Sequence, residues 1–432
     1  MEIKIIKCDG SSELKFLNAL SERGKAVSDK AEETVAEILE NVRKNGDAAL
    51  IDYTEKFDGI KMKDFEVSGS RIKNALKTAD AKFLEAAKRA AANITAFHKK
   101  QLKKGFEIKK KDGSRTGQLT RALNRVGIYV PGGTAAYPSS VLMNAIPAKL
   151  AGVKELIMVT PPGVSDEILA AAAICGVDRV FTVGGAQAIA ALAYSTKSIP
   201  KVDKIVGPGN IYVATAKKMV FGTVDIDMIA GPSEILVLAD SFSNPEFIAA
   251  DLISQAEHDT LASAVLITTS REIAKKTVDA LKKQTETAER KQIIEQSLSN
   301  YGGILITETI TEMINLANEL SPEHLEIMIK NPMKYLEKIE NAGSIFLGDW
   351  SPEPLGDYFA GPNHVLPTER TARFFSPLSC DSFIKKSQYI CYTKEALEKS
   401  AGDIMLLAEN EGLFGHKNSI KVRKDRIEKD SK

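Results

Sequence analysis

The sequence of 432 residues contains only five histidines, four cysteines and one tryptophan. The four cysteines are far apart and form no CxxC pair, so nothing indicates a zinc finger or a dithiol redox motif. No charge-free apolar run approaches the roughly 18 residues that suggest a membrane helix. The N-terminal stretch also lacks the apolar core of a signal peptide. We therefore expect a soluble, cytoplasmic protein that does not associate with a membrane.

The charges of the chain nearly cancel, with 58 Lys and Arg against 57 Asp and Glu. A dedicated nucleic-acid binder is usually strongly basic, so we expect no nucleic-acid partner. The local basic run HKKQLKKGFEIKKKDGSR at 98–115 favours a solvated helix end and a loop over a binding patch. His98 lies among the lysines of this run, and we expect it at the surface.

The pattern of apolar residues changes along the chain. Residues 29–104 place apolar side chains at helical spacing between charges, which predicts helices. Over 125–240, and again over 262–348, short apolar runs alternate with glycine turns and helical stretches. This alternation predicts an α/β fold with two Rossmann-like parallel-sheet domains, a helical N-terminal segment and a small helical C-terminal tail domain.

The expected domain borders follow these changes in pattern. The last 50 or so residues carry too few apolar side chains to form a core alone, so we expect them to pack on something else, such as a second subunit. The expected segments are 1–128 (N-terminal, partly contributing to the first α/β domain), 129–234 (first Rossmann-like domain), 235–378 (second α/β domain, with most site residues) and 379–432 (tail).

Three glycine turns follow apparent strands, at 131–133 (PGG), 184–185 (GG) and 207–209 (GPG). Ligands of open α/β sheets bind at the carboxyl ends of strands, and glycine there lets the backbone approach a phosphate closely. Turns after strands need glycine for structural reasons as well, so nucleotide binding is one of two interpretations. The GxGxxG, GxxxxGK[ST] and HExxH motifs are absent.

Two stretches place a glutamate directly before a histidine: SQAEHD at 254–259 and SPEHLE at 321–326. In the first, Gln255 and His258 stand three apart in a run with helical spacing, so both could reach one metal ion. The alternative is a helix end with a solvent-facing histidine. In the second, the adjacent side chains of Glu323 and His324 diverge, which suits two proton-transfer tasks better than joint ligation. The alternative there is a polar turn.

Further polar residues follow toward the C-terminus. Asp357 and His364 lie in GDYFAGPNHVLP, a stretch rich in glycine and proline that suits a rigid, irregular site loop. His416 follows Phe-Gly in the tail, with Glu411 five residues before it. Two histidines and an aspartate with an added amide oxygen would suit zinc or a similar divalent ion.

Together these stretches resemble histidinol dehydrogenase over essentially the whole chain. The similarity rests on several specific stretches in order, among them GIYVPGGTAAYPSSVLMNAIPAKLAGVKELIMVTPP, KIVGPGNIYVATAK, DLISQAEHD, LSPEHLEI, LGDYFAGPNHVLPT and GHKNSI. The resemblance implies a zinc-dependent oxidation of L-histidinol to L-histidine through L-histidinal, using two NAD, in the last steps of histidine biosynthesis. It also implies a homodimer in which the active site is shared between subunits.

The resemblance implies roles for individual residues as well. Glu323 and His324 match the acid/base pair, whereas Thr260 stands where a proline is common in the family. The implied zinc ligands are Gln255, His258, Asp357 and His416, the last from the partner subunit. The implied NAD contacts are Tyr129, Gln187 and Asn210. The implied substrate contacts are Ser233, Gln255, His258, His324, Asp357, His364, Glu411 and His416.

A chemical hypothesis follows from the pair. His324 would remove the alcohol proton as hydride leaves, and Glu323 would then activate the water that attacks the aldehyde. Two rival classes remain: a metallohydrolase, because a similar zinc site with a glutamate base also hydrolyses amides, and a metal-binding homologue without catalytic activity.

Overall fold

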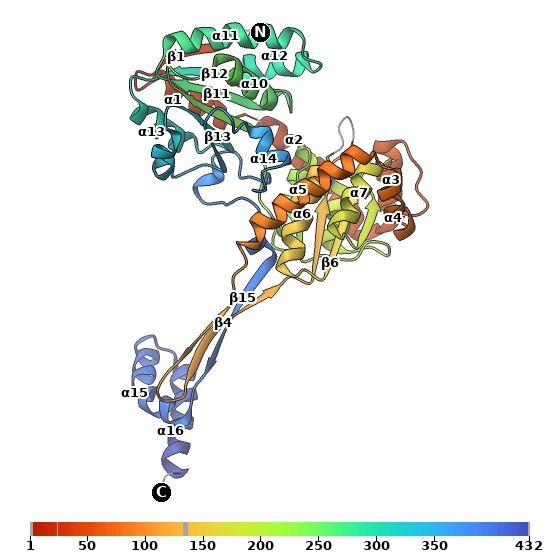
Figure 1. Ribbon diagram of the computed structural model, residues 1–432. Coiled ribbons are helices and arrows are strands. Elements are labelled where there is room, and N and C mark those ends of the chain that lie inside the picture. The colour runs from red at the N-terminus through yellow and green to blue at the C-terminus, as the bar shows by residue number, and fades with distance from the viewer. Residues whose placement is uncertain (1–2, 24, 133–136, 431–432) are drawn as a thin grey trace. The chain divides into compact units, whose positions relative to one another are not determined.

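The computed structural model describes residues 3–23, 25–132 and 137–430. The chain divides into two compact units. The first comprises Met1–Gln101 and Leu123–Phe383, and the second comprises Leu102–Ala122 and Ile384–Lys432. The first unit contains two six-stranded sheets and the second a three-stranded sheet. The predicted α/β fold with parallel sheets is therefore confirmed (Figure 1).

The first six-stranded sheet has the order β2-β7-β6-β5-β8-β9, and its strands from β7 to β9 run parallel. The antiparallel β2 closes one edge. Its strands are β2 (Glu66–Val67), β5 (Arg125–Tyr129), β6 (Glu155–Thr160), β7 (Arg179–Thr182), β8 (Lys204–Val206) and β9 (Asp225–Ile226). The helices packed with this sheet are α2 (Lys25–Asn45), α3 (Asp47–Asp58), α4 (Gly69–Thr78), α5 (Ala81–Lys99), α6 (Pro138–Ala151), α7 (Asp166–Cys175), α8 (Gly185–Tyr194) and α9 (Ile211–Val220).

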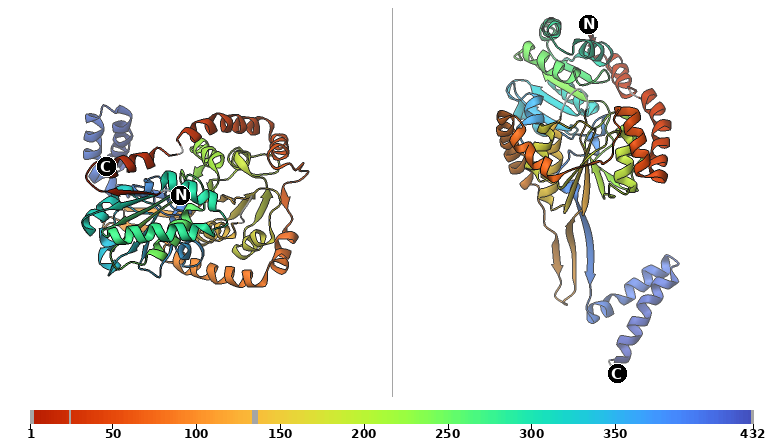
Figure 2. Two further views of the ribbon diagram at one scale, coloured as in Figure 1. Left: turned by 90° about the horizontal axis from the view of Figure 1, so that it is seen from above. Right: turned by 90° about the vertical axis from the view of Figure 1, so that its right-hand side faces the viewer.

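Alternate residues of these strands point to opposite faces, each covered by helices. In β6, Leu156 and Met158 join the core under α5, α6 and α7, whereas Ile157 and Val159 join the core under α2, α8 and α9. Figure 2, left, shows the red-brown α2 and the orange α5 on opposite sides of the strands. Burial on both faces explains why these strands read as continuous apolar runs.

The second six-stranded sheet is wholly parallel, with the order β1-β12-β11-β10-β13-β14. Its strands are β1 (Lys4–Lys7), β10 (Glu234–Ala239), β11 (Ser263–Thr268), β12 (Gly303–Ile306), β13 (His324–Met328) and β14 (Ser344–Leu347). The accompanying helices are α1 (Ser12–Ser21), α10 (Pro245–Ala256), α11 (Arg271–Glu286), α12 (Lys291–Tyr301), α13 (Ile310–Leu320) and the short α14 (Glu353–Tyr358). Three 3₁₀ turns also occur, at Pro332–Lys338, Thr371–Arg373 and Cys380–Phe383.

Both sheets reverse their strand order once. In the first sheet β5, β6 and β7 are added in one direction, and β8 and β9 on the other side of β5. In the second sheet β10, β11 and β12 run one way, whereas β13 and β14 lie beyond β10. Such a reversal leaves a crevice between neighbouring loops, where α/β proteins bind their ligands.

The second unit is built around an antiparallel sheet with the order β15-β4-β3. Its elements are β3 (Phe106–Lys109), β4 (Arg115–Ala122), β15 (Ile384–Cys391), α15 (Lys394–Asn410) and α16 (Phe414–Asp430). The two helices pack against each other as a helical hairpin, drawn in violet-blue in Figure 2. Several large apolar side chains of these helices are exposed, namely Leu406, Leu407, Leu413, Phe414 and Val422.

Two expectations about the basic run were wrong. Residues 106–122 form a β-hairpin rather than a loop, because β3 pairs antiparallel with β4, and β15 adds to β4 from more than 250 residues away in the sequence. His98 is fully buried, since its Nδ1 atom contacts the Ile94 carbonyl at 3.0 Å and its Nε2 atom meets Asn363 at 3.3 Å.

The expected borders at residues 128, 234 and 378 remain a prediction. The structure adds that the N-terminal segment contributes strands to both six-stranded sheets, since β1 pairs with β12 and β2 pairs with β7. Across the described parts of the chain, no helix combines the length and the apolar character needed to cross a membrane.

Candidate active site

The pair Glu323 and His324 lies where the chain enters β13 from α13. Ser321 ends α13 in a left-handed conformation (φ 48°), and Pro322 follows, so the helix cannot continue. Both side chains are buried. Gly343 lies against the same turn, where a Cβ atom would come within 2.5 Å of the Glu323 carbonyl oxygen. The structure therefore holds the pair in a fixed, tightly packed turn.

One hydrogen bond determines which nitrogen of His324 carries the proton. Its Nδ1 atom lies 2.9 Å from the main-chain carbonyl of Glu234, and a carbonyl can only accept a hydrogen bond. In the neutral ring Nδ1 is therefore protonated and Nε2 carries the lone pair. Nε2 has no hydrogen-bond partner among the described residues. Burial lowers the pKa of His324, which favours the neutral ring that a general base requires.

Glu323 has the opposite electrostatic behaviour. Burial raises its pKa well above the ordinary value, and the charges of Glu234, Asp357 and Glu353 add to this effect. The main-chain N–H of Glu234 donates to its Oε2 atom at 2.9 Å, which stabilises the charged form. Oε2 also lies 3.6 Å from Nδ1 of His324. A buried carboxyl group and a buried imidazole are thus held side by side with their pKa values displaced, as expected for a proton-transfer pair.

Carboxylates gather around the free nitrogen of His324. Its Nε2 atom lies 3.8 Å from Glu353 and 3.9 Å from Asp357, and the Asp357 carboxylate lies 3.9 Å from Nδ1 of His364. The side chains of His324, Glu353 and Asp357 bring one ligand-type atom each within 4.8 Å of one another, which is compatible with a bound metal ion. Burial and then the Asp357 carboxylate raise the pKa of Glu353 to about 9. A cation would offset this clustering of negative charge.

Gln255 and His258 approach the same region from the end of α10. The helix ends at Ala256, so His258 lies in the turn after it and is exposed. Gln255 is fully buried, and neither its Oε1 nor its Nε2 atom has a partner within the described chain. Ser254 links this helix end to α14, because its hydroxyl donates to the Glu353 carboxylate at 3.4 Å. A buried amide without a hydrogen-bond partner, such as that of Gln255 in this region of carboxylates, is typical of a ligand site.

Three carboxyl groups of this region were not predicted from the sequence: Glu353, Glu326 and Asp251. Glu326 lies two residues after His324 on the same face of β13, and burial followed by the Asp251 charge raises its pKa well above the ordinary value. Burial raises the pKa of Asp251 to about 6. Helical spacing was an available signal, since Glu353 precedes Asp357 by four residues and Asp251 precedes Gln255 by four.

The three residues expected at NAD lie at the carboxyl edge of the first sheet. Tyr129 ends β5, and its hydroxyl accepts from the Gly185 N–H at 3.1 Å at the start of α8. Gln187 is buried in that helix, with its Oε1 atom unpaired within the described residues. Asn210 is the exposed N-cap of α9 and accepts from two main-chain N–H groups. Gly207 (φ 110°) must be glycine, because a Cβ atom would meet the Tyr129 carbonyl oxygen at 2.2 Å.

The remaining predicted residues fall in two places. Ser233 is partly buried immediately before β10, and its carbonyl accepts from the Ser263 N–H at 3.0 Å. Glu411 follows the end of α15, and His416 lies in the first turn of α16. Both of these are exposed and belong to the second unit. The first unit therefore contains all the predicted site residues except Glu411 and His416.

Two open α/β sheets, with a buried histidine whose Nε2 is unpaired among the described residues and a cluster suited to a cation, are the features of a two-sheet α/β enzyme. The chain belongs to the histidinol dehydrogenase family: the family model "Histidinol dehydrogenase" matches residues 21–424. It is similar to histidinol dehydrogenases of Listeria innocua serovar 6a (57% identity, covering 94% of this chain and 96% of the relative) and Clostridium acetobutylicum (55%, covering 98% and 99%). The chain is therefore an oxidoreductase.

A solved structure supports the same assignment. The crystal structure of histidinol dehydrogenase from Elizabethkingia anophelis matches with a TM-score of 0.90 and 38% identity, and the match covers 99% of each chain. The resemblance predicted from the sequence stretches is thus confirmed over nearly the whole chain.

Proposed function

We propose that this protein oxidises L-histidinol to L-histidine through L-histidinal, in two NAD-dependent steps at a zinc site, as the last steps of histidine biosynthesis. The observation that carries the proposal is the geometry of His324. Its Nδ1–H is held by a carbonyl, and its free Nε2 faces Glu353 and Asp357 beside the buried Glu323. Membership of the family supports the choice of substrate.

The first step converts the alcohol to the aldehyde. His324 Nε2 takes the proton from the hydroxyl oxygen of histidinol while hydride leaves the carbon that bears this oxygen, so the substrate loses two electrons and two hydrogens. Burial favours the neutral imidazole, and its Nδ1–H bond fixes the ring so that the Nε2 lone pair faces the side of Glu353 and Asp357. General-base catalysis of this kind contributes about 10²–10⁴-fold in rate.

The second step converts the aldehyde to the acid and consumes one water. Glu323 takes a proton from that water as it adds to the carbonyl carbon, and hydride then leaves the resulting hydrate. A carboxyl group with a raised pKa is a stronger base when ionised, and the Glu234 N–H helps to keep the charged form available. Because Glu323 and His324 diverge from one turn, they can act on different atoms of one bound substrate.

Zinc is proposed at Gln255, His258, Asp357 and His416. The fit is supported by the unpaired buried amide of Gln255 and by the carboxylate of Asp357 between two imidazoles. Zinc would supply positive charge and open positions that orient the imidazole and amine of histidinol. Ser233, His364 and Glu411 are proposed as further substrate contacts, together with Gln255, His258, His324, Asp357 and His416.

NAD is proposed at Tyr129, Gln187 and Asn210. The turns around these residues flank the reversal of strand order between β5 and β8, and Gln187 presents an oxygen that the described residues leave unpaired. NAD would accept the two hydrides. These three residues would hold the cofactor and exclude water from its reacting face.

We also propose a homodimer whose sites are shared. Glu411 and His416 would then serve the active site of the partner subunit. The proposal is supported by the exposed apolar side chains on α15 and α16, which need covering, and by the small share of buried residues in these helices.

The deciding experiment combines purified protein with NAD and L-histidinol and follows absorbance at the NADH wavelength. We expect two NADH per histidinol and no NADH from histidine. A metallohydrolase or a metal-binding homologue without catalytic activity would give no NADH. Absence of NADH from protein loaded with zinc would overturn the proposal.

A further inference from the structure

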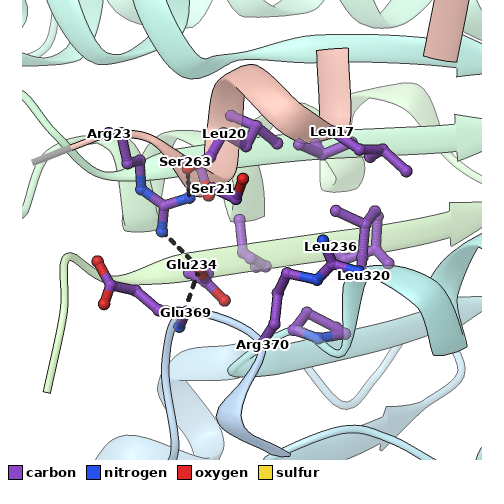
Figure 3. A pocket seen from close by; sticks show the side chains of 13 residues that line it. Leu17, Leu20, Ser21, Arg23, Glu234, Leu236, Ser263, Leu320, Glu369 and Arg370 are labelled. Carbon is purple, nitrogen blue, oxygen red and sulfur yellow. Dashed lines mark hydrogen bonds and ion pairs between the residues drawn. The ribbon is translucent and has the colours of Figure 1, made fainter. Parts of the chain in front are cut away.

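Arg23, which follows α1 near the N-terminus, is inserted beside the amino end of β10. Only 6% of the residue is exposed. Its guanidinium donates to the carbonyls of Leu20 at 3.3 Å and Pro232 at 3.1 Å, and to the Glu234 carboxylate. Figure 3 shows the arginine reaching from the helix to Glu234, with Glu369 on the far side. A segment more than 200 residues away in the sequence thus anchors one glutamate of the second sheet.

Glu234 in turn holds both members of the proton-transfer pair. Its N–H donates to the Glu323 carboxylate at 2.9 Å, and its carbonyl accepts from His324 Nδ1 at 2.9 Å. The bond from the Glu323 N–H back to the Glu234 carboxylate, at 3.3 Å, makes the link reciprocal. One residue therefore fixes the carboxylate of Glu323 and the tautomer of His324 through its main chain, while its side chain is fixed by Arg23.

Charge explains why an arginine is needed at this point. Glu234 and Glu323 are two buried carboxyl groups bonded to each other's main chain, and like charges in such a place repel. The Arg23 guanidinium is always charged and presents several donors in a rigid fork. It therefore pairs with the Glu234 carboxylate and holds it in place beside Glu323.

The cavity beside this pair is too small to be a second substrate site. Its volume is about 50 Å³, enough for a few water molecules at most. Its lining includes leucines of α1 and Arg370, whose guanidinium pairs with the exposed Glu319. The polar contacts of Arg23 are directed to Glu234 and to main-chain carbonyls.

We propose that Arg23 and Glu234 form a positioning pair for the oxidation of histidinol: Arg23 fixes Glu234, and Glu234 orients the Glu323 carboxylate and the His324 ring. The proposal rests on the roles given to Glu323 and His324 under the proposed function. The Glu234 carboxylate is bound by Arg23 and by the N–H groups of Glu323 and Glu369, so loss of the pair should lower kcat and leave the KM for histidinol near the wild-type value. Both oxidation steps slow together, because Glu234 holds both side chains.

The test uses the full-length protein with zinc and NAD, in the variants Arg23→Met and Arg23→Lys. Misplacement of reacting groups by about 1 Å can cost on the order of 10²-fold, so we expect Arg23→Met to lower kcat by about 10–100-fold with histidinol and with histidinal. Arg23→Lys keeps the positive charge but cannot reproduce the several hydrogen-bond donors of the guanidinium. Its kcat should therefore lie between those of the wild type and of Arg23→Met. Arg370→Met is the matched control from the same cavity and should keep wild-type kcat.

Wild-type kcat in folded Arg23→Met, with only a lower Tm, would overturn the proposal and leave the pair a structural role. Should Arg23→Met not fold, Arg23→Lys decides: wild-type kcat in that variant would overturn the proposal equally. Glu323→Gln is measured beside them. Full activity in Glu323→Gln would remove the role of Glu323 itself, whereas an inactive Glu323→Gln with a fully active Arg23→Met would remove only the positioning pair.

Discussion

The two six-stranded sheets share a strand order, but their candidate site residues lie at opposite edges. In the first sheet the candidate NAD residues follow the carboxyl ends of β5, β7 and β8. In the second sheet Ser233 and His324 stand at the amino ends of β10 and β13, and His258 leads into the amino end of β11. Ligands of open α/β sheets usually bind at the carboxyl edge, and the candidate residues of the second sheet lie at the other edge.

The amino edge offers something that the carboxyl edge does not. The first N–H groups of a strand point out of the ladder there, and one of them, on Glu234, donates to the Glu323 carboxylate. The carboxyl edge instead offers glycine turns and helix N-termini, which suit a phosphate-bearing cofactor. The comparison predicts that changes in the second sheet affect the chemical steps, whereas changes in the first affect cofactor binding.

The largest effect is expected from the proton-transfer pair of the second sheet. Glu323→Gln should slow histidinal oxidation by about 10²–10⁴-fold, because no base then activates the water. His324→Gln should slow histidinol oxidation by a similar factor, since the alcohol proton then has no acceptor. Stopped-flow NADH formation from each substrate measures the two steps. Full turnover of histidinal by Glu323→Gln, with loss of histidinol oxidation, would show that the assigned roles are wrong.

The next effect concerns the metal at the same edge. His258→Asn removes an imidazole ligand and should weaken zinc binding by at least about 10–100-fold, the range seen when only outer-shell partners of a ligand are changed. Zinc per subunit after dialysis and NADH formation should fall together. Glu257→Gln, one residue away, is the matched control and should retain zinc. Unchanged zinc content in His258→Asn would remove His258 from the site.

The fold and the site were predictable from the sequence to different degrees. Apolar runs followed by glycine turns predicted the parallel strands, because both faces of each sheet are covered by helices. The burial of His98 was not predictable, since it depends on Asn363, over 250 residues away, and the pairing of β15 with the local β3–β4 hairpin joins segments equally far apart. Local spacing carries no record of such contacts.

For the site, specific stretches were more informative than spacing. Glu323 and His324 were singled out by the sequence, but their bonds to Glu234 were invisible to it, because β10 and β13 pair across about 90 intervening residues. The three missed carboxyl groups were dispersed in the same way. Pairing Glu353 with Asp357 needed only helical spacing, whereas pairing Glu326 with Asp251 needed the packing of α10 on the sheet.

A moderate effect is expected at the first sheet. Asn210→Ala should raise the KM for NAD about tenfold, because loss of one good hydrogen bond is worth about 1.4 kcal/mol at most. It also removes the N-cap of α9, which should cost about 1 kcal/mol in stability. Asn210→Ser keeps a capping oxygen without the amide, so its stability should recover while the KM stays high. An unchanged KM in Asn210→Ala would leave Asn210 a capping role alone.

The smallest expected effect concerns the pH dependence of folding stability rather than a reaction rate. His98, packed on the first sheet, is buried, and burial lowers its pKa below the ordinary value of about 6.5. As the pH falls below about 6.5, His98 becomes protonated in the unfolded chain while it stays neutral in the folded chain. Stability is therefore fully present above that pH and declines below it, by up to about 1.4 kcal/mol per pH unit for one group.

Replacing His98 should remove its share of this slope. Urea unfolding of His98→Gln between pH 7 and pH 5.5 should show a shallower loss of stability than the wild type, even if its stability at pH 8 is lower. Burial also lowers the pKa values of His324 and of the partly buried His364, so part of the slope should remain. An identical slope in the variant would assign the whole acid sensitivity to the second sheet and its loops. The kcat for histidinol at pH 8 should stay near wild type, because Asn363 is still held by its 2.6 Å bond to the Met143 carbonyl.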